Sequence, residues 1–157
     1  MMKSTAIILG GLGHDQTAEI QRSLRDVCST WSPSGLSDWK QREATKHRLI
    51  NYQGPVAIIA HSYGVDMAAW LGEELELDLI MLIDPVGKGK WLDPWAKQTA
   101  PKAGKVIVFE RSAFTWFPPY TTKIESANEY VRVGAGHNSI CRDKGLIQRI
   151  VAEVKGL

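Results

Sequence analysis

Short apolar runs along the whole chain constrain the fold more than any other feature of the sequence. Most of them are continuously apolar rather than alternating, which is typical of strands buried on both faces of a parallel sheet. The runs are TAIIL (5–9), VAIIA (56–60), LIMLI (79–83), KVIVF (105–109) and EYVRV (129–133). A weaker run, VCSTW (27–31), predicts a further strand at an edge of the sheet.

Helical patterns lie between these runs. The first places Ile20, Leu24 and Val27 on one face, and the second is expected to start at Ser37 or Asp38, carry Trp39 and end near Ile50. Further helices are predicted over Val65–Leu75, from Asp93–Pro94, where an aspartate N-cap precedes proline, and at the C-terminus on the stripe Leu146, Ile147, Ile150, Val151 and Val154.

The alternation of strands and helices predicts an α/β protein. We expect a three-layer fold with a mostly parallel sheet of about six strands, helices on both faces and right-handed crossovers. The length of 157 residues suits a single domain over 1–157. In sheets of this kind, sites lie where the strands end.

Composition excludes several classes of function. The net charge of +2, without a dense basic run, gives no indication of a nucleic-acid partner. Cys28 and Cys141 lie far apart and match no metal or redox spacing. The apolar run Ala6–Leu9 is too short for a signal peptide or a membrane span. We therefore expect a cytoplasmic protein; the sequence does not indicate its oligomeric state.

The stretch AHSYG (60–64) joins a predicted strand to a predicted helix. A serine in such a turn has a strained backbone, and its hydroxyl projects above the sheet. Ala60 and Gly64 are small, as the crowding two residues before and after Ser62 requires. The backbone N–H of Tyr63 would then help to hold a developing oxyanion. The alternative is a serine that only caps the helix.

Two other strand ends carry related features. GGLGHD (10–15) follows the first strand; its glycines match no complete phosphate-binding motif, but they allow a backbone N–H such as that of Leu12 to point at an anion. GAGHNSI (134–140) follows the last strand and places His137 where it can lie over Ser62. A serine turn followed by a histidine after the final strand indicates nucleophilic catalysis.

These motifs resemble those of the α/β-hydrolase family, most of all its minimal lid-less bacterial lipases and esterases, across nearly the whole chain. The resemblance implies Ser62 as nucleophile, His137 as general base and acid, and the N–H groups of Leu12 and Tyr63 as the oxyanion hole. Many relatives have His-Gly in the first loop, whereas here Gly10–Gly13 precedes His14.

The acid is the second departure from the family pattern. Many relatives have an aspartate after the next-to-last strand, but ERSAFTWFPPY (110–120) contains none. Asp84, at the end of LIMLI, resembles the acid of pancreatic-type lipases, and Glu110 lies nearest to the commoner place. We favour Asp84 and keep Glu110 as the alternative.

The expected function is a serine hydrolase that cleaves a carboxylic ester or thioester through an acyl-enzyme at Ser62, with no cofactor or metal. Its partner would be a small-molecule acyl substrate. The alternatives are an acyltransferase or amidase with the same residues, or an inactive hydrolase fold that binds a ligand. His61 is expected to pack beside the serine and Cys141 to be a buried thiol. The aromatic residues Trp91, Trp95, Trp116 and Phe117 are expected either to wall an acyl pocket or to belong to the core.

Overall fold

The computed structural model describes residues 3–11, 14–33, 39–90 and 92–157. Its elements are β1 (Thr5–Leu9), η1 (His14–Thr17), α1 (Ala18–Leu24), β2 (Ser29–Trp31), α2 (Trp39–Ile50), β3 (Val56–His61), α3 (Gly64–Glu74), β4 (Leu79–Ile83), β5 (Lys97–Thr99), β6 (Lys105–Arg111), β7 (Lys123–Glu125), β8 (Glu129–Val133), η2 (Ile140–Arg142) and α4 (Lys144–Lys155). A six-stranded sheet has the order β2-β1-β3-β4-β6-β8, and every pair in it is parallel. The predicted α/β architecture is confirmed.

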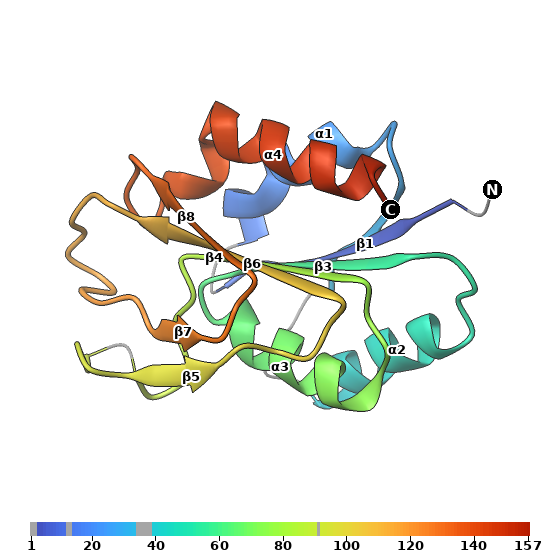
Figure 1. Cartoon of the computed structure of the whole chain (residues 1–157), viewed down its shortest axis with the longest axis horizontal. Coiled ribbons are helices and arrows are strands. Elements are labelled where there is room, and N and C mark those ends of the chain that lie inside the picture. Colours follow the sequence, from blue (N-terminus) through green and yellow to red (C-terminus); the bar gives the residue numbers. More distant parts are fainter. Residues whose placement is uncertain (1–2, 12–13, 34–38, 91) are drawn as a thin grey trace.

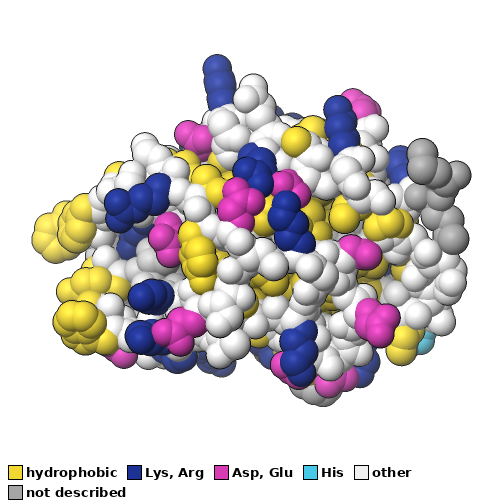
Figure 2. Space-filling view, in the orientation of Figure 1, with side chains coloured by type: hydrophobic (Ala, Val, Ile, Leu, Met, Phe, Trp, Pro, Cys, Tyr) yellow, Lys and Arg dark blue, Asp and Glu magenta, His cyan; other side chains and the backbone are white. Residues whose placement is uncertain are grey.

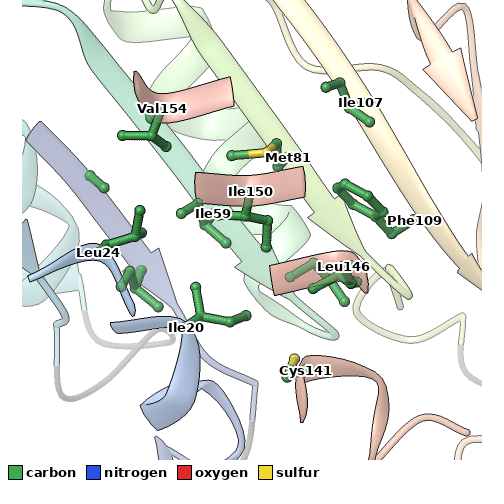
Figure 3. Close-up of a cluster of buried hydrophobic side chains, with 14 of the residues drawn as sticks. Ile20, Leu24, Ile59, Met81, Ile107, Phe109, Cys141, Leu146, Ile150 and Val154 are labelled. Atoms are coloured by element: carbon green, nitrogen blue, oxygen red, sulfur yellow. The ribbon is translucent and has the colours of Figure 1, made fainter. Parts of the chain in front are cut away.

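Helices cover both faces of the sheet (Figure 1). Successive side chains of a strand point to opposite faces, so Ala6 and Ile8 join one hydrophobic cluster while Ile7 and Leu9 join the other. The first cluster lies under α1 and α4, and the second lies against α2 and α3. Figure 3 shows Leu146, Ile150 and Val154 of α4 over the strand residues Ile59, Met81, Ile107 and Phe109. The central strands are thus buried on both faces, as their continuous apolar runs predict.

Some local expectations differ from the structure. The helix predicted from Asp93–Pro94 is absent: the Asp93 carboxylate accepts a hydrogen bond from the backbone N–H of Trp95 at 2.9 Å, and the chain continues into β5. Aspartate side chains cap turns as readily as helices, which explains the error. The first helix ends at Leu24 rather than reaching Val27. The caps expected at Ser37 or Asp38 lie outside the described residues.

A second, two-stranded parallel sheet joins β5 to β7 and has no counterpart in the sequence prediction. Its strands are three residues long, too short for periodicity to reveal. In the described part of the chain, no helix has the length and apolar character needed to cross a membrane.

All strands of the main sheet run in the same direction, so their carboxyl ends meet at one edge. Figure 1 shows this edge at the left, where the loops after β4, β6 and β8 converge. The serine turn after β3 opens at the same edge.

Candidate active site

Ser62 forms a strained turn between β3 and α3. Its φ of 54° lies in the left-handed region, which non-glycine residues seldom adopt. The turn is fixed by backbone hydrogen bonds: the N–H of Ser62 donates to the carbonyl of Ile83 at 3.1 Å, and the N–H of Val86 donates to the carbonyl of Ser62 at 3.1 Å. The neighbouring strand β4 therefore holds the serine in the strained geometry that is typical of a nucleophile turn, where the hydroxyl projects above the sheet.

Two glycines allow this turn to pack. A Cβ at Gly64 would lie 2.5 Å from the carbonyl oxygen of Leu9 on β1. A Cβ at Gly11 would lie 2.8 Å from the Cβ of Ser62. The crowding at Gly64 therefore comes from β1 and not from Ala60, which differs from the expectation that Ala60 and Gly64 crowd each other.

Asp84 and His137 meet beside this turn. The Nδ1–H of His137 donates to Oδ2 of Asp84, which is fully buried after β4 and has a φ of 40°. Thr121 donates its hydroxyl proton to Oδ1 of the same carboxylate. The backbone N–H of Asp84 donates to Phe109 at 2.7 Å. This arrangement occupies Nδ1 of His137 and leaves Nε2 as the ring nitrogen that can exchange a proton with a serine.

Ser62 and His137 line the same small cavity, of about 100 Å³. Its other lining residues are Gln16, Tyr63, Phe117, Pro118 and Asn138. Gln16 donates a side-chain hydrogen bond to Asn138 at 3.2 Å, which joins the loop after β1 to the loop of the histidine. Serine, histidine and a cavity for a ligand thus come together at the carboxyl edge of the sheet.

Glu110, the alternative acid, lies elsewhere. It is a half-buried residue of β6, opposite Arg132 of β8 in the sheet register. Among the described residues, the only carboxylate in contact with His137 is that of Asp84.

Tyr63 is the N-cap of α3. Its backbone N–H belongs to the first turn, where N–H groups have no acceptor within the helix. Leu12, the other oxyanion donor that the resemblance implies, lies outside the described residues.

Arg111, which the sequence analysis did not single out, also reaches the acid. Its Nε lies 3.4 Å from Oδ2 of Asp84, and its side chain is only 6% exposed. The guanidinium also donates to the carbonyl of Pro118 at 2.7 Å and to the hydroxyl of Thr115. One cation therefore links the buried carboxylate to the loop that walls the cavity. An arginine at the end of a strand gives no pattern that a single sequence could reveal.

His61 is fully buried directly before the serine. A carbonyl oxygen can only accept, so the contact of 3.1 Å between Nε2 of His61 and the backbone oxygen of His137 is an N–H donation by His61. The two rings also lie against each other, with centroids 4.7 Å apart. Nδ1 of His61 is buried without a hydrogen-bond partner in the described part of the chain. Burial and the nearby His137 lower the pKa of His61 from 6.5 to about 4, so the ring is neutral near pH 7.

The remaining expectations concern a thiol and the aromatic residues. Cys141 is fully buried, and burial raises the pKa of its thiol to about 12, so it is not a thiolate nucleophile.

Phe117 lines the cavity as expected. Trp95 and Trp116 do not: they are 85% and 90% exposed. Trp91 lies outside the described residues.

Comparisons with known proteins agree with this fold. No protein-family model matches the chain, and no curated protein matches it in sequence. One similar solved structure, reported for the metagenome-derived lipolytic enzymes LipS and LipT, has a TM-score of 0.69 at 12% identity, over 99% of this chain and 95% of that one.

Two further solved structures illustrate the range of neighbours. A protein of Pectobacterium atrosepticum, described as a YdeN-like hydrolase, has a TM-score of 0.62 at 15% identity, over 98% of this chain and 91% of that one. The RedJ thioesterase of the prodiginine pathway of Streptomyces coelicolor has a TM-score of 0.53 at 12% identity, over 99% of this chain and 89% of that one. The chain therefore has the α/β-hydrolase fold.

Proposed function

We propose that this protein is a serine hydrolase that cleaves a carboxylic ester or thioester through an acyl-enzyme at Ser62. The observation that carries the proposal is that Ser62 and His137 line one cavity while His137 contacts a buried carboxylate. Ser62 is held at a φ of 54° and shares a cavity with His137, whose Nδ1 is bonded to the buried Asp84. The lipolytic and thioesterase activities named for the structural neighbours support the choice of ester or thioester.

The chemistry would proceed in two halves. Ser62 attacks the acyl carbonyl while Nε2 of His137 takes the hydroxyl proton, and the backbone N–H of Tyr63 donates to the developing oxyanion. His137 then gives the proton to the departing alcohol or thiol, leaving an ester on Ser62. Water, deprotonated by the same Nε2, then attacks the carbonyl of this ester; the bond to Oγ of Ser62 breaks, His137 returns the proton to Oγ, and the acid leaves. Asp84 holds the tautomer of His137 and stabilises the imidazolium in both halves.

A fluorophosphonate probe tests the proposal, because it reacts with an activated serine. We expect covalent labelling at Ser62, located by peptide mass spectrometry, and no labelling of Ser62→Ala. An inactive ligand-binding protein would remain unlabelled. For the labelled enzyme, rates on p-nitrophenyl esters of increasing chain length would then define the preferred acyl group, and the same series in the presence of an alcohol or amine acceptor would reveal acyl transfer.

A further inference from the structure

Large hydrophobic side chains are exposed at the edge of the molecule where the cavity of Ser62 lies. They belong to the loop between β4 and β5 and to the loop between β6 and β7. We call them the aromatic edge: Leu92 is 61% exposed, Trp95 85%, Phe114 75%, Trp116 90% and Phe117 51%. In Figure 2, hydrophobic side chains protrude at the left, where Figure 1 places these two loops. Clustered exposed hydrophobic residues of this kind mark binding surfaces.

Buried contacts hold the loop between β6 and β7 in place. Arg111, itself anchored on Asp84, donates to the carbonyl of Pro118 at 2.7 Å. Within the loop, the rings of Phe114 and Trp116 lie 6.4 Å apart, edge to face. The aromatic side chains therefore project from a loop that is bonded at its base.

The two loops also form one surface. The backbone N–H of Lys123 donates to Ala96 at 3.0 Å, and that of Thr122 donates to Pro85 at 2.9 Å, so the end of the loop before β7 is bonded to both ends of the loop between β4 and β5. Phe117 belongs both to the aromatic edge and to the lining of the cavity that contains Ser62 and His137. Whatever binds the aromatic edge therefore meets the mouth of the candidate active site.

The charge of these loops is positive. Residues 112–122 carry no charged side chain, and residues 85–97 and 112–123 together contain four lysines and one aspartate. Lys97 forms an ion pair with Glu125 at 3.0 Å. Lys88 and Lys123 are exposed, and no acid among the described residues forms an ion pair with their ammonium groups, although the backbone N–H of Lys88 donates to the carboxylate of Asp66 at 2.8 Å. The surface thus combines protruding aromatic rings with unpaired cations.

We propose that the aromatic edge docks on an anionic lipid surface. Tryptophan and other aromatic side chains partition to the membrane–water interface, and neighbouring lysines are attracted to anionic headgroups. A second copy fits less well, because a symmetric contact would bring the lysines of both copies together. A rigid protein partner would need pockets for separate protruding side chains, whereas a lipid interface takes them without a complementary shape.

The inference rests on the proposed function in one respect, because docking would bring membrane-resident acyl esters to Ser62. In that case the substrate class is an ester too insoluble to reach the cavity through water. The docking itself requires no catalysis and can be measured separately.

The test is a vesicle co-sedimentation experiment with the full chain. The probes are vesicles of phosphatidylcholine alone and of phosphatidylcholine mixed with phosphatidylglycerol. We expect binding to the mixed vesicles that falls as salt is raised, and much weaker binding to phosphatidylcholine. The double variant Trp95→Ser/Trp116→Ser should lose at least about tenfold in partitioning, because two aromatic side chains no longer leave water. Lys88→Gln and Lys123→Gln should each cost about fivefold.

Matched controls come from the opposite edge of the sheet. Ile50 is 57% exposed at the end of α2, and Lys155 is exposed in the last turn of α4, so Ile50→Ser and Lys155→Gln should bind as the wild type does. Ser62→Ala should also bind normally, which separates docking from catalysis. The double tryptophan variant should hydrolyse a short water-soluble ester within about twofold of the wild-type rate.

Three results would overturn the proposal. The first is no binding of the wild type to phosphatidylglycerol vesicles. The second is equal binding by the wild type and the double tryptophan variant, when circular dichroism shows that both proteins are folded. The third is a dimer in lipid-free sedimentation that the double variant abolishes, which would make the aromatic edge an interface between copies. If vesicle binding behaves as expected but Ser62 is not labelled by fluorophosphonate, the docking stands and the proposed hydrolase activity fails.

Discussion

The buried His61 makes the stability of the fold sensitive to acid. Its Nε2–H is committed to the carbonyl of His137, so a second proton would enter at Nδ1, which is buried and has no acceptor among the described residues. Burial, followed by the charge of His137, lowers the pKa of His61 from 6.5 to about 4; the hydrogen bond to the His137 backbone and the carboxylate of Asp84 act in the opposite direction.

The sign of the effect follows from proton linkage. Between pH 6.5 and about 4 the unfolded chain binds a proton at this histidine that the folded chain does not, so acidification favours unfolding. Each unit of difference between the pKa of His61 in the folded and in the unfolded chain is worth about 1.4 kcal/mol. Below both pKa values, His61 therefore lowers the free energy of unfolding by about 3 kcal/mol. Between pH 8 and pH 5, His61 is expected to lower the free energy of unfolding by about 2 kcal/mol.

The assay is urea unfolding of His61→Gln and of the wild type at pH 8 and pH 5, followed by far-UV circular dichroism with linear extrapolation. Glutamine keeps a donor but cannot titrate, so its loss of unfolding free energy between the two pH values should be smaller than that of the wild type by about 2 kcal/mol. His47→Gln, on the exposed surface of α2, is the matched control and should lose as much as the wild type. Equal losses in His61→Gln and the wild type would refute the reasoning.

Other substitutions test the surroundings of the serine turn. Asp84→Asn should lower kcat/KM for ester hydrolysis by at least about 10²-fold and Glu110→Gln by less than about tenfold; the reverse order would transfer the role of the acid. Gly64→Ala should reduce the free energy of unfolding by about 1–3 kcal/mol, because its Cβ would lie 2.5 Å from a backbone oxygen, whereas Gly134→Ala meets no atom within 4 Å and should change it by less than about 0.5 kcal/mol. His61→Leu should lower kcat at least about tenfold with KM within about twofold, while His61→Gln retains most of kcat; equal losses would mean that the donated hydrogen bond does not position the base.

The fold was largely predictable because its signals are local. Continuous apolar runs marked the buried strands β1, β3 and β4 within a residue of their observed bounds. The apolar stripe over Leu146, Ile150 and Val154 likewise marked α4, whose buried face it forms. In both cases the pattern reflects burial against the rest of the core, so sequence and structure agree.

The errors arose where a local pattern fits two structures, or where a strand depends on a partner that is distant in the sequence. Asp93 before proline has the pattern of a helix N-cap, yet its carboxylate closes a turn onto Trp95. The strands β5 and β7 depend on pairing with each other across 26 residues, from Lys97 to Lys123, which no local pattern encodes.

The candidate site was predictable to the extent that the chain marks strand ends. Ser62, Asp84 and His137 each follow a strand, and a parallel sheet brings such positions to one edge. The residues that contact Asp84 and His137 were not predictable. Arg111 of β6 and Thr121 in the loop after it both reach Asp84, and His61 donates a hydrogen bond to the backbone of His137. These contacts depend on side-chain directions that only the folded structure supplies.

The identity of the nucleophile is the central claim, and the hydrolysis rate of purified Ser62→Ala on a soluble p-nitrophenyl ester tests it most directly. The proposed mechanism predicts a loss of at least about 10³-fold, because it forms the acyl-enzyme on the hydroxyl that this substitution removes. Circular dichroism and the unfolding midpoint should show that the fold is retained. A folded variant that keeps more than about a tenth of the wild-type rate would contradict the claim that Ser62 is the nucleophile.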